Sequence, residues 1–370
     1  MIPQISSKRE NDDILTFNMK NTNVSIANAL RRTLMSDIEN VVFHTFPYSE
    51  NKCEILKNTT RFNNEIIKHR LSCVPIHITD LTIPLENYLL VLNKKNTSGT
   101  LEYVTTEDFQ IKDIKTDKFL SKGDRDGIFP KNELTGDYIE FLRLRPKLAS
   151  NLDGEEIALT SKFSISTAKE NSAYNMVSTC VYKNTLDAVR ANDVWAGKEK
   201  ELKASGMKTD EIAFEKKNWY LLDANRIFVP DSFDFKIKTI GVFKNEELIK
   251  KACDALIRSF THVKQSIETD NNTVVTVKPT TTTIENCFDV VLYGYDYTVG
   301  KVLEYFIYTT HYGGDKMLTY CGFNKEHPHD NHSLLRIGFK NQTDVGVVKQ
   351  FLDEALSKSI DVFSEINDNF

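Results

Sequence analysis

The sequence predicts an α+β protein in which two related modules pair within one chain as a pseudo-dimer, and in which a mixed domain interrupts the first module. Two observations lead to this prediction. Both ends of the 370-residue chain show the same order of elements: a strand, a turn, a short helix, further strands and a long amphipathic helix. The centre of the chain instead alternates short strand candidates with polar turns. We expect this division: first module, 1–40 and 229–268; inserted domain, 41–228; linker, 269–286; second, smaller module, 287–370.

Four elements make up the first module. The segment ILTFNM, residues 14–19, has the partial alternation of a strand. Ser25 opens a helix that extends to about Ile38, because its hydroxyl can accept a hydrogen bond from a backbone N–H of the first turn. Residues 232–240 alternate as a strand, and residues 245–268 place apolar side chains on one face of a long helix. We expect these residues at the interface with the second module: Ile26, Ala27, Leu30, Leu34 and Leu256.

The inserted domain is predicted to be rich in loops. Its strand candidates are residues 41–45, 88–92, 137–144 and 157–165. A polar, glycine-containing turn is expected at 121–127. Residues 198–217 are rich in charge, so we expect a solvated helix or loop there.

The second module repeats the plan of the first. Thr298 opens a helix that extends to about Thr309, and its first six residues can be superposed on 25–30. The small residue of each helix, Ala27 or Gly300, allows another backbone or helix to approach closely. A long helix with one apolar face needs a partner, and two such modules supply each other with one. The other expected elements are a strand at 288–292, a turn marked by Gly294 and Asp296, a hairpin at 317–323 and 333–339, and a helix at 344–366. The expected interface residues are Val299, Gly300, Leu303, Leu352 and Leu356.

Charge and cysteine content argue against several classes of function. The chain has 47 basic and 52 acidic residues, and a net charge of −5 argues against a protein that mainly coats nucleic acid. None of the six cysteines forms a CxxC pair, so neither a four-cysteine zinc site nor a disulfide scaffold is expected. The polar N-terminal segment lacks the apolar core of a signal peptide, and no stretch reaches the ~18 apolar residues of a membrane span. We therefore expect an intracellular, reducing compartment.

Two polar clusters have both a functional and a structural interpretation. The segment 327–332 holds three histidines and an aspartate that could bind a metal, but their short spacing at a hairpin tip favours a solvated turn. Arg31 and Arg32 point about 100° apart on their helix. They form either a solvated helix face or a docking contact, since a guanidinium makes paired hydrogen bonds to carboxylates. The docking interpretation predicts that removal of both side chains leaves the fold intact.

Several short stretches resemble one known family, in the order in which that family has them. They are 28–32 (NALRR), 64–76 (NEIIKHRLSCVPI), 154–157 (GEEI) with 168–171 (AKEN), 296–300 (DYTVG), 321–328 (CGFNKEHP) and 334–337 (LLRI). The first four resemble the alpha-type subunits of DNA-directed RNA polymerase, which include bacterial alpha and the third-largest archaeal and eukaryotic subunit. The last three resemble the small dimerisation partner of that subunit. The sequence departs from the family at Asn171, Tyr174, Lys301 and Glu304, where His, Trp, Asn and Arg are usual.

The resemblance implies a non-catalytic assembly subunit of a multisubunit DNA-directed RNA polymerase, in which two alpha-like dimerisation modules share one chain, as in large cytoplasmic DNA viruses. Its implied partners are the two large catalytic subunits and small assembly subunits, with DNA contacted only through the complex and no membrane contact. The implied location is the host cytoplasm and the virion for a viral protein, and the nucleus otherwise. No cofactor is implied. Some family members bind a metal through clustered cysteines of the inserted domain, whereas the cysteines of that region here, Cys53, Cys73 and Cys180, lie far apart. The docking residues implied for the large subunits are Arg31, Arg32, His69 and Arg70.

Two alternatives remain at the level of the sequence. A stand-alone dimeric binding protein could use the same fold, and it would purify without a polymerase. An enzyme could carry a polar cleft in the region 41–228, although no catalytic motif is found there.

Overall fold

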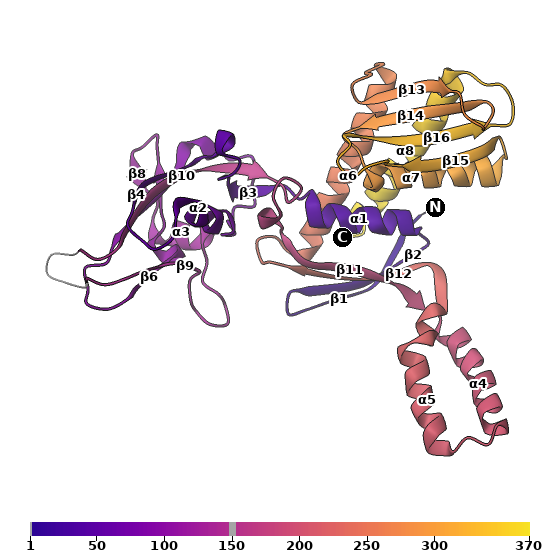
Figure 1. Cartoon of the computed structure of the whole chain (residues 1–370), viewed down its shortest axis with the longest axis horizontal. Coiled ribbons are helices and arrows are strands. Elements are labelled where there is room, and N and C mark those ends of the chain that lie inside the picture. Colours follow the sequence, from indigo (N-terminus) through magenta and orange to yellow (C-terminus); the bar gives the residue numbers. More distant parts are fainter. Residues whose placement is uncertain (1, 148–152) are drawn as a thin grey trace. The chain divides into compact units, whose positions relative to one another are not determined.

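The computed structural model describes residues 2–147 and 153–370 (Figure 1). The chain divides into two compact units. The first comprises residues 1–34, 179–238 and 245–370, and the second comprises 35–178 and 239–244. Residues 179–228, which the sequence analysis assigned to the inserted domain, thus group with the first unit. The physical reason is that the strand β11 (Val177–Leu186) pairs within a sheet of the first unit.

The first sheet of the first unit has the strand order β1-β2-β12-β11. Its strands are β1 (Gln4–Asn11), β2 (Ile14–Lys20), β11 (Val177–Leu186) and β12 (Phe228–Thr239). β2 and β12 are antiparallel, and Phe17 lies opposite Phe235. Alternate residues of the two strands are buried on one face: Leu15, Phe17, Met19, Phe233, Phe235 and Ile237. The helix α1 (Val24–Ser36) follows β2, and α6 (Asn245–Glu268) follows β12.

The second sheet of this unit has the order β13-β14-β16-β15. Its strands are β13 (Val275–Thr280), β14 (Cys287–Tyr293), β15 (Leu318–Asn324) and β16 (His332–Phe339). The helix α7 (Tyr297–Ile307) and the helix α8 (Val345–Asp368) pack against this sheet, as Figure 1 shows. A π-helical segment, Tyr308–Gly314, continues α7 beyond the helix end that the sequence predicted.

A helical hairpin lies between β11 and β12. It consists of α4 (Ala188–Ala204) and α5 (Thr209–Leu221), which run side by side in Figure 1. Trp195 and Trp219 meet in its small core, with 6.2 Å between their ring centroids. The charged segment 198–217 therefore forms most of a helical pair, with its lysines outside and the tryptophans inside.

The second unit is a mixed domain around two sheets. The larger has the order β3-β10-β5-β7-β8, with β4 also paired to β10, and the smaller pairs β6 with β9. The strands are β3 (Asn40–Phe43), β4 (Cys53–Asn58), β5 (Tyr88–Lys95), β6 (Glu102–Thr105), β7 (Gln110–Asp113), β8 (Lys118–Phe119), β9 (Glu140–Leu144) and β10 (Glu156–Ser166). Its helices are α2 (Asn64–Ser72) and α3 (Lys122–Ile128), and its core is rich in phenylalanine.

Three segments differ from the sequence-based prediction. The expected linker 269–286 contains β13, an edge strand that accommodates Pro279 because its outer edge needs no ladder hydrogen bond. The polar segment Gln4–Asn11 is a strand, because pairing with β2 stabilises it without a buried face of its own. The expected turn at 121–127 is largely the short helix α3, whose first turn is capped by the Ser121 side chain, which accepts from the backbone N–H of Asp124 at 3.2 Å.

Candidate functional site

The two long helices α6 and α8 pack against each other in the first unit. Phe260 of α6 stacks on Phe363 of α8, with 5.8 Å between the ring centroids. Lys264 of α6 donates to the hydroxyl of Ser357 at 2.8 Å and lies 3.2 Å from the carboxylate of Asp353, both on α8. The seam between the helices therefore combines a stacked aromatic pair with an ionic contact at its edge.

All ten residues predicted for the interface between the modules are buried. They are Ile26, Ala27, Leu30, Leu34, Leu256, Val299, Gly300, Leu303, Leu352 and Leu356. Gly300 has a role that differs from the expected one. A Cβ atom there would lie 1.9 Å from the ring of Phe323, which comes from β15 of the same module. Glycine at this position thus makes room for the ring of Phe323 on the neighbouring strand, and not for a second helix as expected.

The caps of α1 and α7 lie two residues before the predicted positions. The side chain of Asn23 accepts from the backbone N–H of Ser25 at 2.8 Å, and α1 begins at Val24. In the same way, the Asp296 carboxylate accepts from the backbone N–H of Thr298 at 2.8 Å. Asparagine and aspartate rank with serine and above threonine as capping residues, so both hydroxyl residues were misassigned as caps. The identical spacing strengthens the correspondence between the two helix openings.

The predicted docking arginines have different structural roles. Arg32 of α1 reaches the cap of α7: its Nη2 donates to Asp296 Oδ2 at 2.6 Å, and its Nε donates to Thr298 Oγ1 at 2.9 Å. Arg31 donates to Asn28 Oδ1 at 2.9 and 3.0 Å, within its own helix. Arg32 therefore joins α1 to α7, whereas the hydrogen bonds of Arg31 stay local.

The position in α7 that matches Arg32 holds a tyrosine instead. When Ser25 is superposed on Thr298, Tyr305 takes the place of Arg32, and it borders a hollow of about 400 Å³ beside the start of α1. Lys301 and Glu304, the two departures from the family pattern, pair with each other at 2.6 Å on the same wall. Burial, followed by the Asp231 carboxylate, raises the pKa of Tyr305. The two halves thus differ chemically at equivalent places.

His69 and Arg70 lie in the last turn of α2 in the second unit. Arg70 donates to the backbone carbonyls of Phe141 at 2.7 Å and Glu140 at 3.1 Å, so it holds α2 against β9. His69 is exposed beside it. Of this predicted pair, Arg70 contributes to the internal packing of the unit, and His69 presents its side chain to the surface.

The Gly-x-Glu segment at 154–156 also has a structural role. A Cβ on Gly154 would lie 2.1 Å from the carbonyl oxygen of Asn96, so only glycine allows this approach. Glu155 accepts from the backbone N–H of Arg145 at 2.8 Å and from its Nε at 2.5 Å. Gly154 and Glu155 therefore stabilise the packing of the second unit through contacts with Asn96 and Arg145.

Potential metal ligands do not converge in the part of the chain that the structure describes, where no three His, Cys, Asp or Glu side chains form a metal-binding group. His327 Nδ1 accepts from the backbone N–H of His329 at 3.1 Å, and Asp330 accepts from the backbone N–H of His327 at 3.0 Å. These groups stabilise the hairpin turn instead. Burial raises the pKa of Cys53 to about 11 and the pKa of Cys180 to about 12.

Sequence reasoning missed the polar partners of the site. Asp296 was interpreted as a turn marker and as part of the family-like segment 296–300, although an aspartate two residues before a helical threonine is itself a capping signal. Asn18 and Asp234, which face each other across β2 and β12, were not singled out. An isolated polar residue at an alternating strand position marks the open face of a sheet, and this signal was available in both strands.

Comparison with known proteins gives a consistent family. Residues 16–260 match the RNA polymerase Rpb3/Rpb11 dimerisation domain. The second sheet with α7 and α8 lies outside the matched residues. Among the helices that the structure describes, none combines the length and apolarity needed to cross a bilayer.

Individual relatives are archaeal and plant polymerase subunits. The DNA-directed RNA polymerase subunit Rpo3 of Pyrococcus furiosus is 22 % identical over 272 residues, which covers 69 % of this chain and 92 % of the relative. Rpo3 of Archaeoglobus fulgidus is 24 % identical over 185 residues, covering 50 % of this chain and 61 % of the relative. Subunit 3 of RNA polymerases II, IV and V of Arabidopsis thaliana is 35 % identical over 74 residues. That match covers 20 % of this chain, which spans about a fifth (21 %) of the length of the plant relative.

Proposed function

Because this chain belongs to the RNA polymerase Rpb3/Rpb11 dimerisation domain family, we propose that it is a non-catalytic assembly subunit of a multisubunit DNA-directed RNA polymerase. Its task is to present one composite surface to the two large catalytic subunits, where the chemistry takes place. The observation that carries this proposal is the family match over residues 16–260. The Rpo3 relatives, whose names identify them as polymerase subunits, support it.

The proposal extends to an intramolecular pseudo-dimer. The first module, which comprises 1–34, 179–238 and 245–268, is interrupted in sequence by the second unit and pairs with the second module (287–370) across the segment 269–286. Support comes from the equivalent caps at Asn23 and Asp296 and from the contact of α6 with α8. Joining the modules raises their effective concentration for each other, fixes their ratio and removes the bimolecular pairing step.

The proposed docking residues for the large subunits are Arg31 in the first unit and His69 in the second, while Arg32 and Arg70 each stabilise their own unit. This distinction rests on the internal bonds of Arg32 and Arg70. Small assembly subunits are further partners, DNA is reached only through the complex, and the protein acts inside the cell. A viral protein of this kind, fused as in large cytoplasmic DNA viruses, acts in the host cytoplasm and the virion, and a cellular one acts in the nucleus.

Affinity purification of the tagged full chain from the cells that express it tests the proposal. We expect both large polymerase subunits to copurify in equal amounts with the tagged chain. The variant Arg31→Ala/His69→Ala should fold normally but recover less of the large subunits. A chain that elutes alone, or only with a second copy of itself, would identify the stand-alone binding protein instead.

A further inference from the structure

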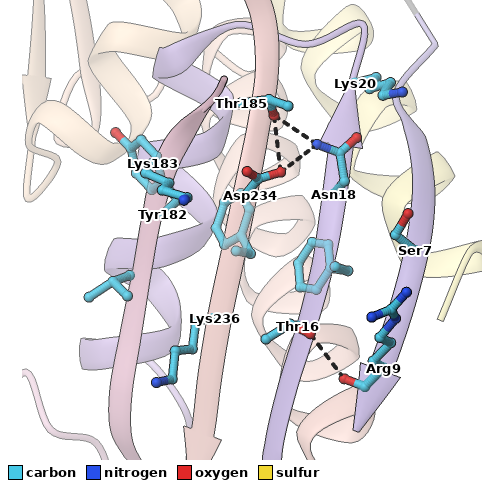
Figure 2. A pocket seen from close by; sticks show the side chains of 13 residues that line it. Ser7, Arg9, Thr16, Asn18, Lys20, Tyr182, Lys183, Thr185, Asp234 and Lys236 are labelled. Atoms are coloured by element: carbon cyan, nitrogen blue, oxygen red, sulfur yellow. Dashed lines mark hydrogen bonds between the residues drawn. The ribbon is translucent and has the colours of Figure 1, made fainter. Parts of the chain in front are cut away.

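One face of the first sheet is open and polar. On β2, Thr16, Asn18 and Lys20 point away from the buried apolar face, and on β12 the residues opposite Thr16 and Asn18 are Lys236 and Asp234. These side chains, together with β1 and β11, line a shallow hollow of about 630 Å³ (Figure 2). Its lining residues come from four neighbouring strands, so the hollow extends across the sheet, where an extended polypeptide can lie over it.

The floor of the hollow is a closed hydrogen-bond network. Asn18 Nδ2 donates to Asp234 Oδ1 and to Thr185 Oγ1, each at 2.8 Å, and lies 3.1 Å from Ser232 Oγ. Thr185 also donates to Asp234 Oδ1 at 3.1 Å. Asp234 is the one carboxylate among the lining residues, and one of its oxygens already accepts both bonds. The network therefore fixes the floor, and Asp234 contributes one negative charge to the face.

The rim of the hollow is basic. Arg9, Lys20, Lys183 and Lys236 surround the network in Figure 2, and all four are exposed. In residues 2–147 and 153–370, none of these four side chains forms an ion pair or a side-chain hydrogen bond. Four cations and one carboxylate gather here, so the face is positive on a chain whose net charge is −5. A concentrated positive field of this kind attracts an oppositely charged partner and orients it on approach.

We propose that this face binds an extended acidic segment of a partner polypeptide. Acidic side chains of the segment pair with Lys183 and Lys236 on one side of the network, and with Arg9 and Lys20 on the other. Charge-assisted bonds of this type are short and directional. This surface lies beyond the docking residues proposed above, and the inference does not depend on the polymerase assignment.

A nucleic acid fits the face less well. Single-stranded nucleic acid is held mainly by stacking of bases on exposed aromatic rings. The phenylalanines nearest the hollow, Phe17 and Phe235, are 3 % and 2 % exposed, and they stack on each other on the opposite face of the sheet. Tyr182 is half-buried and packs against Phe233 and Phe235. The rim thus offers charge but no stacking platform.

Fluorescence anisotropy with the full chain tests this proposal. The probe is a labelled peptide of about eight residues that alternates glutamate with serine, a length that spans one strand. The wild-type chain should bind this peptide at low salt and should not bind the matched glutamine peptide. Lys183→Glu/Lys236→Glu should weaken binding by about tenfold or more. The control Lys200→Glu/Lys217→Glu makes the same change of charge on exposed positions of α4 and α5 and should bind like wild type.

Circular dichroism of each variant establishes that it is folded before binding is compared. No detectable binding by the wild-type chain, or equal loss in both double variants, would overturn the proposal. A single-stranded oligonucleotide of about eight nucleotides that binds more tightly than the acidic peptide would overturn it in favour of a nucleic-acid surface. Because the measurement uses the isolated chain, its outcome is separate from the copurification of large subunits.

Discussion

Replacing Arg32 by alanine should weaken the connection between α1 and α7. The side chain donates to the Asp296 carboxylate at 2.6 Å and to the Thr298 hydroxyl at 2.9 Å. A hydrogen bond to a charged group contributes about 1.5–3 kcal/mol, and an exposed ion pair contributes about 0–1 kcal/mol. The side chains of Arg32 and Asp296 are 36 % and 34 % exposed. We therefore expect the variant to lose about 1–2 kcal/mol of unfolding free energy, between the two limits.

Two further variants isolate this contact. Arg31→Ala removes hydrogen bonds only to Asn28 of the same helix, so its unfolding free energy should stay within about 0.5 kcal/mol of wild type. Asp296→Asn removes the charge and keeps a side chain that caps α7 well. Arg32→Ala and Asp296→Asn should be non-additive, with a coupling energy of about 0.5–1.5 kcal/mol in a double-mutant cycle.

Urea unfolding of wild type, the three single variants and Arg32→Ala/Asp296→Asn, followed by circular dichroism, gives these free energies. Removal of both arginines should thus destabilise the protein through Arg32, which replaces the expectation that the pair can be removed without effect on the fold. In a polymerase capture assay, Arg31→Ala should reduce recovery at unchanged stability. If Arg32→Ala unfolds at the wild-type urea concentration and the coupling energy is zero, the contact does not stabilise the pair of modules.

Three other perturbations test separate parts of the structure. Gly300→Ala should lower the unfolding free energy by about 1–3 kcal/mol, because the added Cβ meets the ring of Phe323. Gly197→Ala, with open space in α4, should be neutral or stabilising, and equal thermal unfolding of the two variants would contradict this packing. The hydrogen bond from Arg336 holds the pKa of Asp289 below its usual range, so its stabilisation is present above about pH 4 and is lost as the pH falls through the lowered native pKa. The stability difference between wild type and Asp289→Asn should accordingly shrink between neutral and strongly acidic urea titrations, and a constant difference would refute it. A thiol reagent should label the native chain at the exposed Cys73, because burial raises the pKa of the other five cysteines. Mass spectrometry of wild type and Cys73→Ser measures the labelling, and labelling that persists in the variant would contradict this expectation.

The mixed α+β class and most elements of the second module could be predicted from the sequence, because their apolar residues alternate or recur strongly. The expected strand 288–292 is β14, and the expected helix 344–366 is α8 with Asp344 as its cap. Elements without a buried face gave no such signal. β1 is exposed at nearly every position, so only its pairing with β2 makes it a strand.

The buried part of the candidate site was predictable and its polar part was not. Helical spacing identified Leu30 and Leu303 as core residues, and both are fully buried. The acceptors of Arg32 depend on a contact with residues 264 and 266 positions away in the chain, which no local pattern encodes. Equally, a pair of adjacent arginines has the same appearance in sequence whether one or both reach a partner.

The pairing of β2 with β12 delays completion of the first sheet during synthesis, because the two strands are far apart in sequence. Asn18 and Asp234 are hydrogen-bonded across these strands, although 216 positions separate them in the chain. At a translation rate of about 5–20 residues per second, β2 waits roughly 10–40 s for its neighbour to emerge from the ribosome. During that interval Leu15, Phe17 and Met19, which are buried in the finished protein, have no strand β12 beside them. The second unit is nearly continuous in sequence, so it can fold before β12 is synthesised, and the sheet that contains the earlier strand β2 is completed afterwards.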